Sequence, residues 1–158
     1  MKNIAREYLP FVLAVFCLFA ARSSLADHYV VPSGSMERTL VPGDRVAVDK
    51  RAYGVRVPFT LHKVTAGAQP ARGDIVIFDS PADRTRLIKR VVAVGGAMLE
   101  VRDGHVLING VAAVNADDTA IESFGQRAAL LELRYGGGPT VAPMRIPRGH
   151  VFVLGDAR

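Results

Sequence analysis

Two hydroxyl groups lie close together in the segment Pro32-Ser33-Gly34-Ser35-Met36, which follows an apolar stretch of the chain. Pro32 restricts its own φ angle and favours an extended conformation at the preceding residue. Gly34 permits a tight turn or a close backbone approach that a side chain would block. The pattern predicts that Ser35 lies on a tight, exposed bend, where its hydroxyl can act as a nucleophile. An ordinary polar loop is the alternative interpretation.

Lys89 interrupts an apolar, β-rich stretch between Ile88 and Val91-Val92. Strand alternation can direct its ammonium group to solvent, where most lysines lie. If the side chain is buried instead, desolvation disfavours the charged form and can lower the pKa from about 10.4 by up to about 3–5 units. A neutral Lys89 beside a serine on a strained loop can act as general base for a serine nucleophile, a known variant of the Ser-His-Asp arrangement.

Other reactive arrangements receive less support from the sequence. A Ser-His-Asp site stays open, but no histidine lies in a context that favours it. Cys17 is the only cysteine, so a zinc site would lack the usual thiolate ligands. We expect no metal ion and no organic cofactor. The histidines show no metal-ligand spacing and are predicted in surface loops or strands: His28, His62, His105 and His150.

A chain of 158 residues is long enough for one domain with a hydrophobic core. The net charge of +5 is compatible with nucleic-acid binding, but the basic residues are scattered and form no lysine or arginine block. A basic domain beside an anionic membrane explains the charge equally well. Nucleic-acid binding is therefore a weak alternative, and we expect no such partner.

The stretch Leu9–Ala21 carries no charged residue. Its length matches the apolar core of a secretory signal, and Ser24-Leu25-Ala26 supplies small residues at cleavage-like spacing. With the apolar residues from position 4 onward, a helix of about 18 residues can cross a thin bilayer. From the residues alone, a cleaved signal peptide and a retained anchor are both open. Lys2 and Arg6 predict a cytoplasmic amino terminus, with the rest of the chain outside the cytoplasm.

Strand and turn patterns begin after Thr39. Pro42-Gly43-Asp44 predicts a turn, followed by a half-buried strand in which Val46 and Val48 alternate with polar residues. Ile75-Val76-Ile77-Phe78 is a continuous apolar run and predicts a buried core strand. Residues 87–94 predict a second β-rich strand, which contains Lys89.

Two dipeptides in the second half of the chain predict successive hairpins. They are Asp103-Gly104 and Asn109-Gly110, each between strand-like segments, and together they indicate a meander. Residues 128–133 fit either a strand or a short helix. Val151–Leu154 predicts the last strand. These patterns together predict a mainly β, antiparallel domain.

Four blocks of the sequence resemble, in order, the motif blocks of bacterial signal peptidase I, the membrane-bound leader peptidase with a Ser–Lys dyad. The blocks span nearly everything after the apolar stretch, and as a set they are very specific. They are Pro32–Met36 with Thr39-Leu40, Gly43-Asp44 and Tyr53-Gly54; Gly73–Phe78; Ile88–Gly96; and Gly149–Arg158.

The resemblance implies a role for each matching residue. Ser35 would be the nucleophile and Lys89 its general base. The backbone N–H of Ser35 and the hydroxyl of Ser33 would form the oxyanion hole. Met36 would pack beside the serine and shape the substrate cleft. As structural support, Arg90 and Asp156 would pair and fix two strands together.

The same resemblance implies a mainly β, antiparallel and partly barrel-like domain with one N-terminal transmembrane helix. Residues 1–8 would be cytoplasmic, residues 9–22 a retained anchor, and residues 23–158 the catalytic domain outside the bacterial cytoplasmic (inner) membrane. The partners implied are membrane lipid and secretory preproteins with small residues before the cut. An extended peptide would bind by adding to a strand edge.

The sequence departs from the resembling family after Gly-Asp-x-Arg. There the family continues with a further serine-containing stretch, whereas this chain stops at Arg158, so we expect that the C-terminal end is missing. Two alternatives follow for function. One is a specialised maturation peptidase of the same family, such as those that process pilins for conjugation. The other is an inactive, membrane-anchored β protein that binds peptides.

Overall fold

A computed structural model describes residues 4–24, 26–54, 62, 65, 67–115 and 117–158. The chain forms two compact units. Unit 1 comprises Met1–Tyr29 and Arg45–Gln69, and unit 2 comprises Val30–Asp44 and Pro70–Arg158. All residues predicted for the site belong to unit 2.

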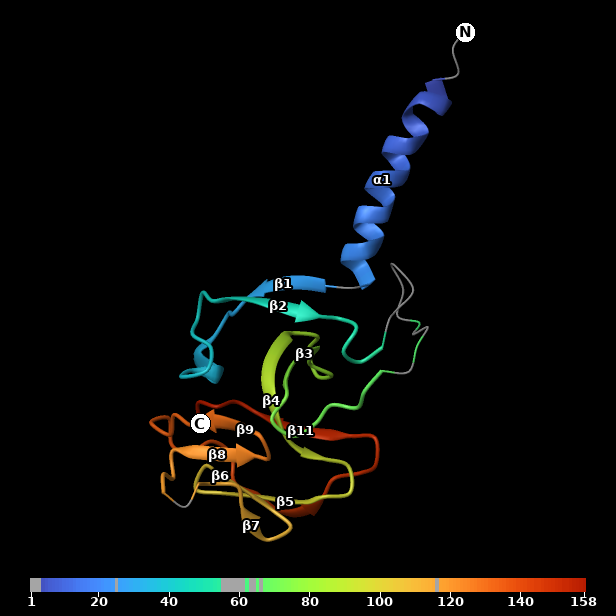
Figure 1. Cartoon of the computed structure of the whole chain (residues 1–158). Coiled ribbons are helices and arrows are strands. Elements are labelled where there is room, and N and C mark those ends of the chain that lie inside the picture. Colours follow the sequence, from blue (N-terminus) through green and yellow to red (C-terminus); the bar gives the residue numbers. More distant parts are fainter. Residues whose placement is uncertain (1–3, 25, 55–61, 63–64, 66, 116) are drawn as a thin grey trace. The chain divides into compact units, whose positions relative to one another are not determined.

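Unit 1 contains the helix α1 (Ile4–Ser24) and most of a two-stranded sheet formed by β1 (Ala26–Val30) and β2 (Arg45–Asp49) (Figure 1). The predicted turn and the strand after it are therefore present. The anchor predicted at residues 9–22 lies within α1. Among the described residues, no helix combines the length and apolar character needed to cross a membrane. The division into cytoplasmic tail, anchor and outer domain stays a prediction.

The central strand of unit 2 is β4 (Arg86–Val94), which pairs antiparallel with β3 (Ile75–Asp79) on one side and β11 (Val151–Leu154) on the other. Val91, Val92 and Ala93 of β4 are fully buried. The strand predicted at 75–78 is present, but its prediction as a buried core strand is wrong: β3 is an edge strand, and Ile75 is 40% exposed. An edge position leaves one side of a strand without a neighbour, which is why an apolar run there stays partly accessible.

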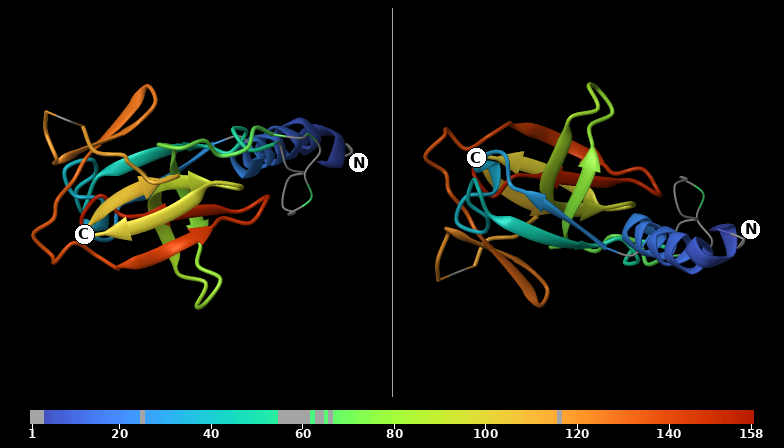
Figure 2. Two further views of the ribbon diagram at one scale, coloured as in Figure 1. Left: turned by 90° about the horizontal axis from the view of Figure 1, so that it is seen from below. Right: turned by 90° about the horizontal axis from the view of Figure 1, so that it is seen from above.

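A second sheet of unit 2 has the order β10-β5-β6-β7. Figure 2 shows these strands from two further directions. Both predicted hairpins are confirmed, because the two residues of each turn have positive φ angles, as a two-residue I′-type hairpin turn requires. The strands are β5 (Met98–Arg102), β6 (His105–Ile108), β7 (Val111–Ala112) and β10 (Val141–Arg145).

A separate hairpin joins β8 (Ile121–Phe124) to β9 (Arg127–Leu130), so the ambiguous segment after residue 127 begins as a strand. Side chains from all three of these sheets form one buried core, in which Leu99, Val106 and Phe124 take part. The mainly antiparallel β prediction is confirmed. The partly barrel-like closure is not found: the described strands form four separate sheets and no closed barrel.

Candidate active site

The predicted nucleophile lies on a short turn between two backbone anchors. Val31 donates its N–H to the carbonyl of Asp44 at 2.8 Å, and Gly43 donates back to the carbonyl of Val31 at 3.0 Å. Between them the 3₁₀ helix η1 (Gly34–Met36) carries Ser35 at its centre. Ser33, just before it, is extended, with φ −147° and ψ 159°. The tight bend predicted for Ser35 is therefore present.

The backbone of Ser35 is held by the last segment of the described chain. The Ala157 N–H donates to the Ser35 carbonyl at 3.2 Å. Gly155 lies so close that a Cβ atom there would be 2.2 Å from the same carbonyl oxygen. Only glycine fits this approach, because a side chain atom at that distance would overlap the oxygen. The final sequence block therefore holds the backbone of Ser35 directly.

The side chains of η1 divide into an exposed and a buried set. The hydroxyl oxygens of Ser33 and Ser35 are 3.5 Å apart in an exposed position, which brings together the two predicted oxyanion-hole residues. Met36, predicted to shape the cleft, is almost fully buried. Its side chain therefore anchors the turn in the protein interior, and its contact with a substrate stays a prediction.

The predicted pair of Arg90 and Asp156 is present and buried, with exposed fractions of 4% and 0%. Arg90 donates from Nε to Oδ1 at 2.9 Å and from Nη2 to Oδ2 at 2.7 Å. The Thr39 hydroxyl donates to Oδ2 of the same carboxylate at 2.5 Å. Thr39 thus links the nucleophile segment to the ion pair. Sequence reasoning gave Thr39 no role, although it lies in the quoted serine block.

Lys89 precedes Arg90 on β4 and is half-buried, opposite Val76 of β3. Burial lowers the pKa of the Lys89 ammonium below its ordinary value, and the nearby Asp156 carboxylate partly opposes this. The helix η1 packs against β4, the strand that carries Lys89. Among the described residues, the Ser35 hydroxyl has its hydrogen-bond contact with Ser33, and no hydrogen bond joins it to the Lys89 amine.

The described residues contain no cluster of three or more His, Cys, Asp or Glu side chains suited to a metal ion. Of the four histidines, three are exposed as predicted. His105 differs, because it is half-buried in the sheet and its Nδ1 atom is buried without a hydrogen-bond partner. Its position on β6, within the second sheet of unit 2, accounts for this burial.

Comparison with known proteins identifies the family. Residues 4–158 match the family described as signal peptidase, peptidase S26. The chain belongs to this family. A signal peptidase I of Pseudomonas fluorescens is 32% identical over 174 aligned positions, which cover 100% of this chain and 60% of that protein. Thylakoidal processing peptidase 1 of Arabidopsis thaliana is 34% identical, over 87% of this chain and 36% of that protein.

A signal peptidase I of Pseudomonas aeruginosa gives the same coverage, also at 32% identity. The chain thus spans about 60% of the length of these two bacterial relatives. Both the serine block and the lysine block lie within the part that matches the peptidase S26 family.

A second buried ion pair supports this peptidase S26 site and was missed by sequence reasoning. Arg158 donates to both carboxylate oxygens of Glu122, at 3.0 and 2.7 Å, and Glu122 also accepts the backbone N–H of Val106 at 2.8 Å. Arg158 further donates to the carbonyl of Gly155 at 2.8 Å. The pair therefore fastens the segment that holds Ser35 to the hairpin of β8.

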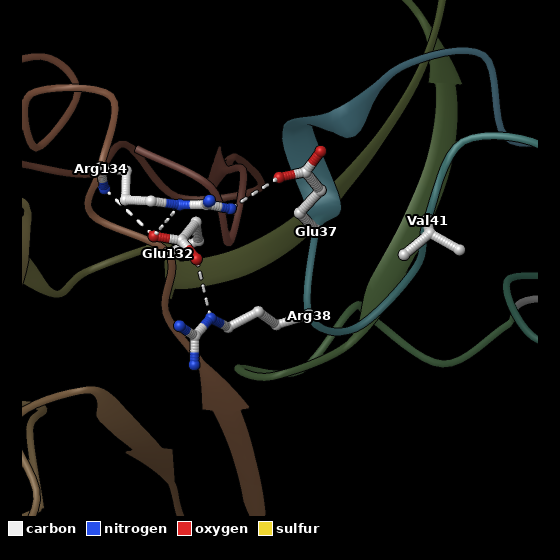
Figure 3. Close-up of a pocket in the computed structure, with 5 residues that line it drawn as sticks. All are labelled: Glu37, Arg38, Val41, Glu132 and Arg134. Atoms are coloured by element: carbon white, nitrogen blue, oxygen red, sulfur yellow. Dashed lines mark hydrogen bonds and ion pairs between the residues drawn. The ribbon is translucent and has the colours of Figure 1, made fainter.

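A shallow pocket of about 550 Å³ is lined in part by residues that follow Ser35 in the sequence (Figure 3). Three of its residues follow η1, and two come from the segment after β9. The Glu132 backbone in that segment accepts the Arg158 N–H at 2.7 Å, so the pocket wall and the Ser35-supporting segment are joined. No motif in the sequence indicated this pocket. Its lining residues are Glu37, Arg38, Val41, Glu132 and Arg134.

Proposed function

We propose that this chain is a serine endopeptidase that removes signal peptides from secreted preproteins, with Ser35 as nucleophile and Lys89 as general base. The observation that carries the proposal is the arrangement of two elements. The turn that presents Ser35 packs against β4, and β4 carries a lysine whose pKa is lowered by burial. The names of the bacterial relatives, signal peptidase I, support the same activity.

In the proposed reaction, Lys89 must be neutral when it meets substrate. A lysine with a pKa of about 10.4 is neutral in fewer than about one molecule in a thousand at pH 7. Burial favours the neutral amine at Lys89, and a bound peptide would exclude more water from the same surface. Hydrogen bonds between catalytic groups often shorten only when substrate binds, so the Ser35–Lys89 contact belongs to the complex in this proposal.

The Ser35 Oγ then bonds to the scissile carbonyl carbon while the Lys89 amine takes the hydroxyl proton. The oxygen that becomes negative accepts hydrogen bonds from the Ser35 N–H and the Ser33 hydroxyl, donors of a kind worth about 10²–10³ in rate. When the C–N bond breaks, the Lys89 ammonium returns the proton to the amine of the mature protein. Water then attacks the acyl carbon while Lys89 takes one of its protons. The bond between that carbon and the Ser35 Oγ breaks, the Lys89 ammonium returns the proton to the Ser35 Oγ, and the signal peptide leaves with the new carboxyl group.

We further propose a membrane-anchored enzyme whose catalytic unit lies outside the bacterial cytoplasmic membrane. The support is the uncharged stretch at 9–21 and the exposed apolar side chains along α1, among them Leu9, Phe11 and Leu18. Membrane fractionation with carbonate extraction tests the anchor, and protease protection in spheroplasts tests the orientation. Release by carbonate, or protection of the catalytic unit from external protease, would refute this part.

Cleavage of a model preprotein with alanine before the cut, in detergent, tests the proposed chemistry. We expect Ser35→Ala and Lys89→Ala each to abolish cleavage without loss of the far-UV circular dichroism spectrum. Ser123→Ala, at an exposed serine of β8, and Lys50→Ala, in unit 1, are matched controls that should retain activity. Cleavage by the Ser35 or Lys89 variant would rule out the proposed dyad.

A further inference from the structure

The pocket beside η1 is built around a buried carboxylate whose oxygens are both engaged. Glu132 is only 4% exposed. Its Oε2 accepts the Nε of Arg38 at 2.9 Å, and its Oε1 accepts the Nε and the backbone N–H of Arg134 at 2.9 and 3.2 Å. Figure 3 shows Glu132 between the two guanidinium groups. Glu132 is therefore an internal counter-ion for both arginines.

The terminal amino groups of Arg38 remain available. Within the described part of the chain, the Arg38 side chain hydrogen-bonds through Nε alone, and 46% of it is exposed. The backbone at Arg38 has φ 72°, a left-handed conformation that non-glycine residues seldom adopt. The Glu132 contact therefore restrains the Arg38 guanidinium through Nε, and its terminal amino groups have no partner among the described residues.

The other acidic residue of the pocket is only loosely associated with an arginine. Glu37 is 3.7 Å from Nη2 of Arg134, which is too long for a hydrogen bond, and it accepts the hydroxyl of Tyr135 at 3.1 Å. Most of the Arg134 side chain is exposed. The pocket thus contains two arginines and two carboxylates, so its formal charges balance. The arginine N–H groups that neither carboxylate occupies are the ones available to a further anionic partner.

A carboxylate is the partner that fits these N–H groups. Two parallel N–H groups of a guanidinium match the two oxygens of a carboxylate, and this geometry distinguishes arginine from lysine. Because Glu132 already fixes the Arg38 side chain, less side-chain entropy is lost when an anion binds. Arg38 follows Ser35 by three residues, so their Cα atoms are at most about 11 Å apart. An extended peptide bound at Ser35 covers that distance within a few residues.

We infer that this pocket binds an acidic side chain of the polypeptide that Ser35 cleaves, a few residues from the scissile bond. The inference rests on the proposed function and adds a charge preference to it. The substrate class becomes preproteins with small residues before the cut and an Asp or Glu nearby. Pairing with partly exposed arginines corresponds to a preference of up to about fivefold.

Peptide pairs that differ only in Glu or Gln test the preference in cleavage. A single Glu, or Gln in the partner peptide, is placed in turn at each position on both sides of the cleavage site in a peptide without other charged residues there. At one position we expect kcat/KM to be up to about fivefold higher for Glu than for Gln, with the ratio falling as salt rises. Arg38→Gln should bring this ratio close to one. The matched control is Arg84→Gln, because Arg84 is an exposed arginine with φ 62° in the β3–β4 loop, and the ratio should stay unchanged.

Binding to the Ser35→Ala variant separates this inference from the proposed function. Fluorescence anisotropy of the labelled peptides should show the same Glu preference without any cleavage, and Arg38→Gln or Arg134→Gln in that background should remove it. If the wild-type chain cleaves no peptide, the proposed function fails, and the binding ratio still decides the role of the pocket. Equal affinity for Glu and Gln peptides at every position, or no peptide binding at all, would overturn the inference. If Arg38→Gln does not fold, Arg134→Gln gives the same test.

Discussion

Replacing Asp156 by asparagine should destabilise the protein strongly, because it breaks a buried ion pair while leaving the cation in place. Asp156 is fully buried and accepts two hydrogen bonds from Arg90 and one from Thr39. Asparagine offers one acceptor oxygen and no charge. The NH₂ group of its amide would face N–H or O–H donors of Arg90 and Thr39 that now donate to a carboxylate oxygen. The Arg90 guanidinium would also remain buried without a counter-ion.

The expected loss in the free energy of unfolding is about 3–5 kcal/mol, the range for removing one partner of a buried ion pair. That is a large part of the roughly 5–15 kcal/mol by which domains are stable. For a chain of this size, the same loss lowers the melting temperature by roughly 6–20 °C. Because Thr39 and Arg90 flank the site, the loss of Asp156 should also reduce cleavage under conditions where the variant is still folded.

Urea unfolding in detergent, followed by far-UV circular dichroism, measures this effect. Asp79→Asn is the matched control, because Asp79 forms an exposed ion pair with Arg86 at 2.9 Å, and its unfolding midpoint should not change. The double variant Arg90→Met/Asp156→Leu should lose less stability than the sum of the two single variants. Each single variant leaves one buried charge unpaired, whereas the double variant removes both charges. A loss below about 1 kcal/mol for Asp156→Asn would refute the reasoning.

Three further predictions concern the nucleophile, the base and the core. Cleavage should rise with pH and level off above an apparent pKa that lies below the ordinary lysine value of 10.5, because burial lowers the pKa of Lys89 and only the neutral amine accepts the proton. A pH-rate profile measures this pKa. Activity that falls as the pH rises toward 10.5 would contradict the prediction. Gly155→Ala should reduce kcat/KM at least about tenfold by displacing the Ser35 carbonyl, from which the new Cβ would lie 2.2 Å, and a variant with wild-type kinetics would exclude that contact. Leu99→Ala, at a fully buried core position, should cost about 2–5 kcal/mol in chemical unfolding, whereas Val111→Ala, at an exposed one, should leave the midpoint unchanged.

Local chemistry explains why several elements could be predicted from the sequence. Asp103-Gly104 and Asn109-Gly110 form hairpin turns because these residue types adopt positive φ angles, whatever surrounds them. Pro32 and Gly34 restrict the backbone around Ser35 in the same local way. The resemblance to the signal peptidase family likewise rests on short sequence blocks that occur in the same order along the chain. These features depend on neighbours in the chain, so the sequence by itself determined them.

Burial and long-range pairing were decided by the tertiary structure. The run at 75–78 has the apolar character of a core strand, but its place at a sheet edge leaves it partly exposed. Thr39 and Asp156 are 117 residues apart in the chain, and Arg38 and Glu132 are 94 apart.

Charged residues such as Glu122, Glu132 and Arg158 are normally solvent-exposed, so the sequence alone gives no reason to bury them. They are buried here because each meets an oppositely charged partner that the fold brings close. The sequence by itself determined the turn that presents Ser35. The chain packing alone decided which distant charges hold that turn in place, because an ion pair depends on distance in space and not on separation along the chain.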